Sequence, residues 1–385
     1  MKKKIAILGS TGSIGKSLLK IIEKNKKNFD VVLLSANKNY KELMQQSKKF
    51  NVKNIIINDI NTFRKIKHKN NRVNIYNNFN NFNKIFKKKI DYTMSAIIGI
   101  EGLYPTINII EFTKKIAIAN KESIICGWNL IEKKLKKNKT EFVPVDSEHF
   151  SIWYALNNSN NNNINKIYLT ASGGPLLNIP RKKINKVSIK DVLKHPNWNM
   201  GKKISVDSST MMNKVFEIIE AKNIFKIDYK KLKIIVHPQS YVHAIINYND
   251  GMIKIVAHET TMEIPIFNSL YSNSNYKNNS KHLKIKKLNK LDFKKVDLKK
   301  FPALKILDLM PNKISLFETA LVSANDELVR LYLDKKINYN DIFRKLIKII
   351  SDKEIVNLKK FSPKNVKEII NLDKYVRLKI GSKSV

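Results

Sequence analysis

The chain opens with an apolar strand, a glycine-rich turn and the start of a helix in immediate succession. Ile5–Leu8 predicts a buried strand, residues 9–15 read GSTGSIG, and a helix is expected to begin near Ser13. Glycine lets the backbone approach a phosphate closely, and the N–H groups at a helix start attract anions. The spacing is GxxGxxG rather than the more usual GxGxxG. The segment predicts a dinucleotide-binding turn, with an ordinary strand-to-helix connection as the alternative.

Short apolar strands alternate with helical stretches from this turn to about residue 145. Such alternation is typical of a parallel sheet that helices cover on both faces. We therefore expect an α/β, Rossmann-like parallel sheet as the domain of residues 1–145. Its strands are expected at Lys4–Leu8, Val31–Ser35, Ile55–Ile57, Thr93–Ile97 and Ile116–Ile118.

From residue 146 the pattern becomes mixed, which predicts a central α+β domain over 146–275. A lysine-rich linker at 276–300 and a C-terminal helical bundle at 301–385 are expected to follow, because apolar residues there recur every three to four positions. The last helix is expected to open at Ser362-Pro363. Asn-rich surface loops are expected at Asn157–Asn165 and Ser272–Ser280. The central strands are expected at Ile167–Thr170, Lys203–Val206 and Ile234–Val236, and a hairpin at Val242–Tyr248 and Met252–Ala257.

The formal net charge of +41 suggests a protein that binds nucleic acid or anionic surfaces. Arginine is the residue best suited to phosphate forks and base edges, yet it is rare here, whereas Lys, Asn and Ile are abundant throughout. We interpret the charge as the compositional bias of an AT-rich coding genome, and expect no nucleic-acid partner. The arginines are Arg64, Arg72, Arg181, Arg330, Arg344 and Arg377.

The single cysteine, Cys126, excludes an internal disulfide and a thiolate metal cluster. It lies between Ile125 and Gly127, so we expect a buried spectator. Because Lys and Asn interrupt every apolar stretch, none approaches the ~20 apolar residues of a membrane span. We expect a cytoplasmic protein with no membrane partner.

The residues at the end of the second strand indicate which dinucleotide cofactor the chain prefers. NAD-specific sites usually place an acidic residue there, on the ribose 2′-hydroxyl. This chain instead has Ser35-Ala36-Asn37-Lys38-Asn39. A cation and amides suit the 2′-phosphate of NADP.

Two further fragments carry candidate site residues. Asp146 and Glu148 stand two residues apart, so an extended backbone would point both carboxylates the same way, as a hard-oxygen site for Mg²⁺ or Mn²⁺. Asn213 and Lys214 precede Glu217 by four and three residues, so all three share a helix face. For the two acids, the alternative to a metal site is a solvated acidic loop. For Asn213, Lys214 and Glu217, the alternative to phosphate capture and metal binding is a surface ladder of ion pairs.

A flexible loop and a flap lie between these fragments. Residues 172–175 read SGGP and can wrap an anion, and residues 195–201 read HPNWNMG. Trp198 stands among Pro, Asn and Gly, where a lid that excludes water is expected, although it could be a core aromatic.

The motifs together resemble the 1-deoxy-D-xylulose 5-phosphate reductoisomerase family over nearly the whole chain. They are GSTGSIG at 9–15, SANKN at 35–39, ANKES at 119–123, PVDSEH at 144–149, SGGP at 172–175, HPNWNMGKKISVDSSTMMNK at 195–214 and VHPQS at 236–240. The resemblance implies a homodimer that uses NADPH and Mn²⁺ or Mg²⁺, possibly Co²⁺, with the catalytic site, a mobile flap and the dimer contact in the domain over 146–275. It implies rearrangement and reduction of a sugar phosphate to 2-C-methyl-D-erythritol 4-phosphate, for isoprenoid precursors.

The resemblance also implies roles for individual residues. Catalysis would involve Lys121, Asp146, Glu148 and Glu217, of which the three acids would bind the metal. The substrate would meet Lys121, Ser147, Glu148, Ser172, His195, Ser208, Asn213, Lys214 and Glu217. NADPH would contact Thr11, Gly12, Ser13, Ile14, Asn37, Lys38, Asn39, Asn120, Glu122 and Gly201.

The chain departs from the family pattern at two positions. Val215 stands where the family has Gly, which a helix tolerates, and Glu263 stands where Arg is usual, which alters a dimer or domain contact. His149, beside the acids, is expected to contact the acids or the substrate rather than to bind the metal, and His237 and His243 are expected to be structural residues.

Two other functions remain open from sequence. A different NADPH-dependent, metal-assisted dehydrogenase would share only residues 1–145, and would give the cluster at 208–217 no phosphate to bind. A basic dinucleotide- or nucleic-acid-binding protein would use the net charge, and its binding would weaken steeply with salt.

Overall fold

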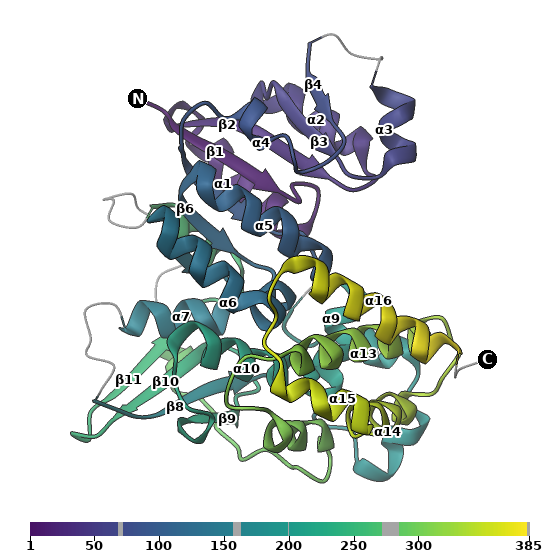
Figure 1. Ribbon diagram of the computed structural model, residues 1–385. Helices are drawn as coiled ribbons and strands as arrows, with labels where there is room; N and C mark the ends of the chain where they lie inside the picture. The colour runs from purple at the N-terminus through teal and green to yellow at the C-terminus, as the bar shows by residue number, and fades with distance from the viewer. Residues whose placement is uncertain (68–71, 157–162, 199, 272–284, 383–385) are drawn as a thin grey trace. The chain divides into compact units, whose positions relative to one another are not determined.

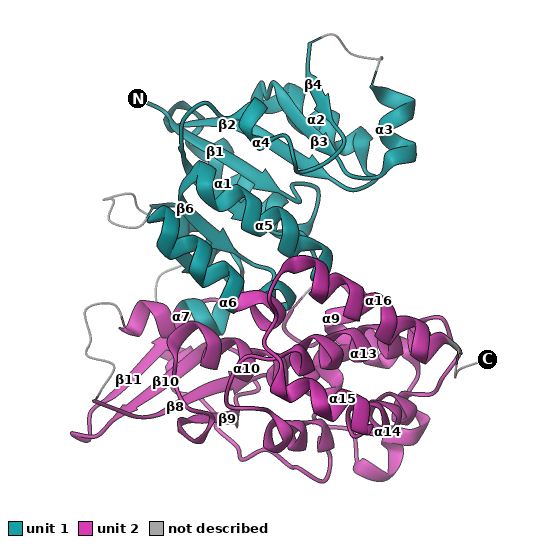
Figure 2. Cartoon of the chain, viewed as in Figure 1, with its two compact units in different colours: residues 1–123, 129–150, 262–279 teal, residues 124–128, 151–261, 280–385 magenta. Residues whose placement is uncertain are grey.

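The structure is a computed structural model that describes residues 1–67, 72–156, 163–198, 200–271 and 285–382 (Figure 1). The chain forms two compact units (Figure 2). The first comprises Met1–Ser123, Asn129–Phe150 and Met262–Asn279, and the second comprises Ile124–Trp128, Ser151–Thr261 and Ser280–Val385. The domain boundaries at 145, 275 and 300 stay predictions. The expected loop at 272–280 and parts of the loop at 157–165 and of the linker at 276–300 lie outside the described residues. The end of the loop expected at 157–165 is wrong, because Ile164 and Asn165 belong to strand β8 (Ile164–Ala171).

The first unit contains a seven-stranded, all-parallel sheet in the order β4-β3-β2-β1-β5-β6-β7. All five expected strands are present. β4 and β7 were not expected as strands, because both are short and polar residues interrupt or border them. The strands are β1 (Lys3–Leu8), β2 (Phe29–Ala36), β3 (Asn54–Ile57), β4 (Asn74–Tyr76), β5 (Ile90–Ser95), β6 (Thr113–Ile118) and β7 (Glu141–Pro144).

Helices connect these strands, as the alternating pattern predicts, and share their apolar core. α1 contributes Leu18 and Ile22, α2 contributes Leu43, and the late helix α11 contributes Ile266 and Leu270 to one cluster with the strands. The chain therefore returns to complete the core of this unit. The helices are α1 (Ser13–Lys24), α2 (Tyr40–Phe50), α3 (Ile60–Ile66), α4 (Phe82–Ile85), α5 (Leu103–Ile109), α6 (Lys121–Asn138), α7 (Ser147–Leu156) and α11 (Glu263–Tyr271); α6 and α7 also run into the second unit.

The strand order reverses at β1, which lies between β2 and β5. Ligands of open α/β sheets bind at such a switch point, beyond the carboxyl ends of the strands. The glycine turn lies there in close packing. Gly9 has φ +85°, and a Cβ on it would lie 2.7 Å from the Ala96 carbonyl oxygen; a Cβ on Gly15 would lie 2.5 Å from Ser10 Cα. Only glycine fits at either position.

The second unit contains a mixed four-stranded sheet in the order β11-β10-β8-β9. β8 pairs in parallel with β9, and β10 pairs antiparallel with both β8 and β11. The expected hairpin is confirmed, with Gly251 at φ +86° in its turn. The strands are β8 (Ile164–Ala171), β9 (Leu232–Val236), β10 (Val242–Tyr248) and β11 (Ile253–Ala257).

The strand expected at Lys203–Val206 is wrong, because this segment is part of helix α9 (Lys202–Thr210). Ile204 and Val206 are β-branched and alternate with polar residues, a pattern that is ambiguous over so few positions. The helix follows Gly201, and Ser205 Oγ donates back to the Gly201 carbonyl at 3.1 Å. Met211 at φ +63° ends α9, and α10 (Met212–Phe225) follows at once.

Helices dominate the rest of the second unit, as expected for the C-terminal bundle. α13 begins at a capping box in which Ser315 and Glu318 exchange hydrogen bonds. The last helix begins at Val366, so the expected start at Ser362-Pro363 is wrong: Ser362 Oγ donates to the Ile314 carbonyl instead. The helices are α8 (Ile189–Leu193), α12 (Ile285–Leu288), α13 (Leu316–Leu333), α14 (Tyr339–Ile350), α15 (Lys353–Asn357) and α16 (Val366–Ser382).

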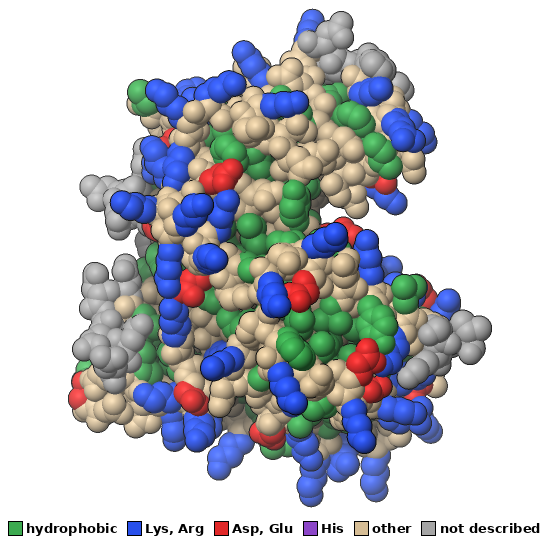
Figure 3. Space-filling view, in the orientation of Figure 1, with side chains coloured by type: hydrophobic (Ala, Val, Ile, Leu, Met, Phe, Trp, Pro, Cys, Tyr) green, Lys and Arg blue, Asp and Glu red, His purple; other side chains and the backbone are tan. Residues whose placement is uncertain are grey.

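Lysine and arginine side chains are spread over the visible surface of both units (Figure 3). They do not gather there into a single basic stripe, and acidic side chains lie among them. This distribution supports a compositional origin of the charge on this face. Within the described ranges, no helix has both the length and the apolar character to cross a membrane.

The close packing of Gly15 predicts that Gly15→Ala destabilises the first unit. A methyl group 2.5 Å from the Ser10 backbone forces the turn and α1 apart, at a cost of about 2 kcal/mol in the free energy of unfolding. Denaturant titration measures it. The matched control is Gly381→Ala in α16, where an added Cβ has open space. Equal stability of the two variants would contradict the packing argument.

Candidate functional site

The glycine turn of the first unit brings the four predicted phosphate contacts to the start of α1. Thr11, Gly12, Ser13 and Ile14 are partly or fully exposed around this helix start, which lies at Ser13 as predicted. The first N–H groups of a helix have no hydrogen-bond acceptor within the helix, so they can bind a pyrophosphate. The arrangement fits the dinucleotide expected there.

The turn is held from α2 by a side chain that the sequence did not single out. Gln46 is buried; its Oε1 accepts from Ser10 Oγ at 2.7 Å, and its Nε2 donates to the Ser10 carbonyl at 3.1 Å. A lone glutamine on a helix gives no recognisable signal in sequence.

The end of β2 exposes the residues expected to select the cofactor. Asn37 and Lys38 are exposed, and thus accessible to a 2′-phosphate. Asn39 caps α2: its Oδ1 accepts from Glu42 N, and its Nδ2 donates to Glu42 Oε2 at 2.7 Å. Any cofactor contact of the Asn39 side chain therefore competes with this cap.

Asn120 is similarly engaged at the start of α6. Its Oδ1 accepts from Ser123 N at 2.7 Å, and its Nδ2 donates to the carbonyls of Ile97 and Gly99. These bonds fix the loop after β5, and Asn120 as a whole is 3% exposed. Glu122, in the same first turn, is 6% exposed.

The two acids after β7 come together in a different way from the one expected. Ser147 begins α7, so the segment is not extended; Asp146 precedes the helix, and Glu148 N donates to its Oδ1 at 3.4 Å. A carboxylate oxygen of each acid nevertheless lies within 4.8 Å of the other. Ser147 Oγ donates to Glu148. The pair presents hard oxygen donors at one point.

Lys121 and His149 contact Asp146. Lys121 Nζ lies 3.1 Å from its Oδ2, and Lys121 is 6% exposed. His149 Nδ1 lies 3.2 Å from its Oδ1, so this histidine contacts an acid of the pair, and its functional role stays a prediction. Because a buried ammonium needs a partner, Lys121 and Asp146 stabilise each other's charged form.

In the second unit, the flap histidine meets the glycine loop. His195 Nε2 lies 3.0 Å from Ser172 Oγ, which also accepts from Gly174 N at 3.1 Å. The backbone N–H groups of Asn197 and Trp198 donate to His195 Nδ1 at 3.2 and 3.0 Å. Since Nδ1 accepts, the proton of the neutral ring lies on Nε2. Ser172 then accepts twice and keeps its own O–H to donate.

Burial lowers the pKa of His195 to about 4. The ring is therefore neutral at pH 7 and offers an N–H donor rather than a positive charge. This donor and the Ser172 hydroxyl suit a phosphate oxygen.

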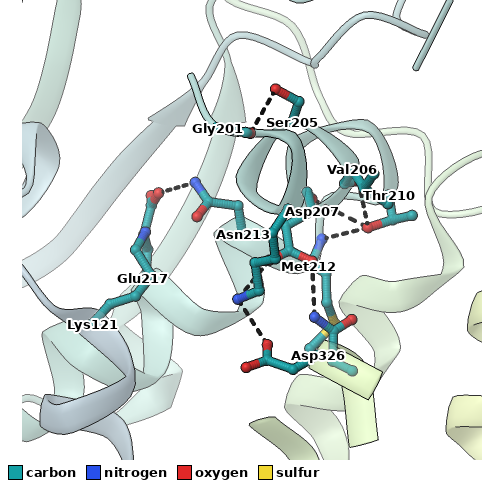
Figure 4. Close-up of polar contacts among 12 residues, drawn as sticks. Lys121, Gly201, Ser205, Val206, Asp207, Thr210, Met212, Asn213, Glu217 and Asp326 are labelled. Carbon is teal, nitrogen blue, oxygen red and sulfur yellow. Dashed lines mark hydrogen bonds and ion pairs between the residues drawn. The ribbon is translucent and has the colours of Figure 1, made fainter. Parts of the chain in front are cut away.

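Asn213 contacts Glu217 (Figure 4), and Lys214 contacts it too, as the helical spacing predicts. Lys214 also donates to the Thr170 carbonyl of β8 at 2.5 Å. Lys214 and Glu217 are 4% and 2% exposed, so the surface-ladder alternative is wrong. This buried charged pair at the end of the sheet is typical of a binding site rather than of a solvated helix face.

Ser208 lies on α9 against the glycine loop. A Cβ on Gly174, which has φ +68°, would lie 2.5 Å from the Ser208 carbonyl oxygen. The loop can therefore approach α9 only because residue 174 is glycine. Gly201, before α9, is exposed.

The remaining expectations concern side chains outside these groups. Cys126 is buried, as predicted. Val215 is fully buried in α10, which tolerates it. His237 and His243 are buried and bond to the carbonyls of Asp292 and His258, as structural histidines do.

Three family models match the chain. "1-deoxy-D-xylulose 5-phosphate reductoisomerase" matches residues 5–127, its "C-terminal domain" matches residues 142–225, and "DXP reductoisomerase C-terminal domain" matches residues 258–379.

Curated proteins of that name match over the full length. The protein of Pelagibacter ubique (strain HTCC1062) is 59% identical over 387 residues, covering 100% of both chains. That of Wolbachia pipientis wMel is 40% identical over 375 residues, covering 96% of this chain and 95% of its own.

Solved structures agree. The reductoisomerase of Zymomonas mobilis in complex with NADPH has a TM-score of 0.88 at 31% identity, covering 100% of this chain and 99% of its own. A reductoisomerase in complex with NADPH, fosmidomycin and magnesium has a TM-score of 0.89 at 30% identity, covering 99% of this chain and 98% of its own.

The fold and the glycine turn are those of a dinucleotide-dependent α/β enzyme. Within that class, the chain belongs to the 1-deoxy-D-xylulose 5-phosphate reductoisomerase family.

The environment of His195 predicts its titration in the ligand-free protein. Its folded pKa of about 4 lies below the ordinary value of 6.5, so its contribution to stability is present above pH 6.5 and is lost as the pH falls toward 4. The imidazole proton shifts in NMR spectra should show a neutral ring at pH 6, with the proton on Nε2. His195→Gln identifies the resonance. A midpoint near 6.5 would contradict the burial.

Proposed function

We propose that this chain catalyses the NADPH- and divalent-metal-dependent rearrangement and reduction of 1-deoxy-D-xylulose 5-phosphate to 2-C-methyl-D-erythritol 4-phosphate, in the supply of isoprenoid precursors. The observation that carries the proposal is the buried Lys214–Glu217 pair with Asn213, beside a loop that offers phosphate donors. Family membership over the full length supports the same reaction.

NADPH is the proposed hydride donor. The start of α1 would hold its pyrophosphate and Lys38, with Asn37 and Asn39, its 2′-phosphate. The full set of proposed contacts is Thr11, Gly12, Ser13, Ile14, Asn37, Lys38, Asn39, Asn120, Glu122 and Gly201. When bound, the nicotinamide supplies the hydride that reduces the aldehyde.

Asp146, Glu148 and Glu217 are the proposed ligands of the divalent cation. Carboxylate oxygens are the donors that Mg²⁺ and Mn²⁺ prefer, and Co²⁺ also accepts them. Lysine ammonium groups pair with Asp146 and Glu217, which holds these carboxylates in place. When bound, the cation supplies Lewis-acid polarisation of the substrate carbonyl.

The substrate phosphate is held by donors. Ser172 offers an O–H and His195 an N–H, and the side chains of Ser208, Asn213 and Lys214 complete the proposed set. Binding energy from this end, remote from the reacting carbons, orients the substrate and favours closure of the flap. Ser147 and Glu148 meet the other end.

Lys121 is the proposed electrostatic partner of the reacting oxygen. Its ammonium is nearly buried beside Asp146, where water screens its charge weakly. A positive charge fixed there stabilises oxyanion character as the carbon skeleton rearranges.

The alternative, another NADPH-dependent metal-assisted dehydrogenase, is less favoured. It would account for the first unit alone, whereas the matches continue through residue 379. It would also leave the polar cluster around Ser172 and Lys214 without a phosphate.

A homodimer in the cytoplasm completes the proposal. β11 ends its sheet order, and Ile253 and Ile255 on one face of it are 57% and 55% exposed. Apolar residues along a sheet edge fit pairing with a second copy. The single, buried cysteine fits a reducing compartment.

The proposed reaction predicts metal-dependent oxidation of NADPH by 1-deoxy-D-xylulose 5-phosphate, followed as loss of nicotinamide absorbance. Glu217→Gln should lower kcat by about a thousandfold, since a metal ligand supports several kcal/mol of charge stabilisation. The matched control is Glu354→Gln, which breaks an exposed pair with Lys379. A folded, NADPH-binding wild-type protein without this activity would refute the reaction.

The proposed dimer predicts that Ile255→Lys produces a monomer, because a buried, unpaired ammonium opposes association. Sedimentation velocity measures the mass. Leu378→Lys places the same charge at a residue of α16 that is 73% exposed, and should leave the dimer intact. A dimer that survives Ile255→Lys would place the interface elsewhere.

A further inference from the structure

A buried carboxylate lies directly before Ser208 in the chain. Asp207 is 1% exposed. Its Oδ1 accepts from Asn325 Nδ2 of α13 at 2.8 Å, and its Oδ2 lies 3.0 Å from Lys203 Nζ, one turn earlier on α9 (Figure 4). No role was expected for this acid, because a strand was expected at Lys203–Val206 and the helical spacing between Lys203 and Asp207 was therefore missed.

The contact extends to a second C-terminal helix. Lys203 Nζ also lies 2.9 Å from Asp326 Oδ1, beside Asn325 on α13. Asp326 in turn pairs with Arg377 of α16 at 3.3 Å, and Lys203 Nζ lies over the Phe216 ring of α10. Residues far apart in the chain therefore converge on one face of α9.

The residue next to Asp207 faces the proposed phosphate site. Ser208 follows by one position, about 100° around the helix, and its backbone packs on Gly174 of the glycine loop. The other hydroxyls of α9, on Ser205, Ser209 and Thr210, donate to carbonyls of the helix or of Gly201 just before it. The contacts of Lys203 and Asp207 with α13 thus hold α9 to a neighbouring helix.

We propose that Asp207 and Asn325 are positioning residues for substrate phosphate. Asn325 fixes Asp207, and because α9 is rigid over one turn, this contact sets where Ser208 presents its hydroxyl. The inference rests on the phosphate role of Ser208 in the proposed function. It assigns the C-terminal helices a part in substrate binding without contact to substrate.

A role in stability alone accounts poorly for this arrangement. Burying a carboxylate and an ammonium costs free energy, and apolar residues of similar volume often serve stability as well or better. The ionic contact also fixes the orientation of α9 against α13, since hydrogen bonds have preferred distances and angles. This argument predicts a loss of phosphate affinity larger than the loss of stability.

Asn325→Leu tests the inference, because it removes the donor and keeps a similar volume. Calorimetric titration with inorganic phosphate should show a dissociation constant raised about tenfold, the effect of one lost hydrogen bond to a charged group. The KM for 1-deoxy-D-xylulose 5-phosphate should rise by a similar factor, while the dissociation constant of NADPH is unchanged.

Ser323→Ala is the matched control. Ser323 is also buried on α13, but its hydroxyl donates within the helix, to the Thr319 carbonyl. This variant should bind phosphate as the wild type does. Unchanged phosphate binding in folded Asn325→Leu, or an equal loss in Ser323→Ala, would overturn the inference.

A second variant keeps the inference testable if Asn325→Leu does not fold. Asp207→Asn preserves size and removes the charge that pairs with Lys203, and should weaken phosphate binding about threefold. In the exchange Asp207→Asn with Asn325→Asp, the amide and the carboxylate trade places, and affinity should recover. Wild-type binding by Asp207→Asn, or no recovery in the exchange, would overturn the inference.

The proposed function can fail separately. If the wild type binds phosphate but does not convert the sugar phosphate, the reaction is refuted while the phosphate comparison still decides the role of Asn325. If the wild type does not bind phosphate at all, both the proposed function and the inference are refuted.

Discussion

The ammonium group of Lys214 joins the sheet of the second unit to its polar helix face. It donates to the Thr170 carbonyl at the end of β8 and to Glu217 on its own helix. A buried cation without partners would cost several kcal/mol, so these two contacts and the position of α10 depend on each other. Through Glu217 the same group also orients Asn213. The contacts of Lys214 therefore hold Asn213 and Glu217 in place along α10.

The groups proposed to hold phosphate are arranged by hydrogen bonds that fix which atom donates. Two backbone N–H groups of the flap direct His195 Nδ1, which leaves Nε2–H facing Ser172. Gly174 N occupies an acceptor site of Ser172, which turns the hydroxyl proton outward. Donors that are already oriented in the free protein lose less conformational entropy when an anion binds. In the proposed phosphate site, Lys214 would supply the positive charge.

The sequence predicted those parts in which one local pattern dominates. The strands of the first unit were found because apolar runs between polar stretches leave little ambiguity, and α1 was placed at Ser13 because glycine and helix signals coincide. The helical spacing of Asn213, Lys214 and Glu217 likewise predicted their contact. The functional roles of these residues stay predictions.

Other parts depend on contacts that no local pattern records. Ile204 and Val206 suggested a strand, yet tertiary packing and the Lys203–Asp207 spacing favour a helix. Ser362-Pro363 looked like a helix start, but Asn365 caps by accepting from Glu368 N, and α16 begins at Val366. Gln46 and Asn325 act across more than thirty positions of chain, so their neighbours do not reveal them.

The return of the chain to the first unit has a consequence for synthesis. Ile266 and Leu270 of α11 belong to the same apolar cluster as α1 and the parallel sheet, and Tyr92 bonds to Ser269. As the protein emerges from the ribosome, the nucleotide-binding half is therefore missing part of its interior until α11 has been made. During translation its sheet exposes an uncovered apolar surface, and this half matures only after much of the other unit has been synthesised.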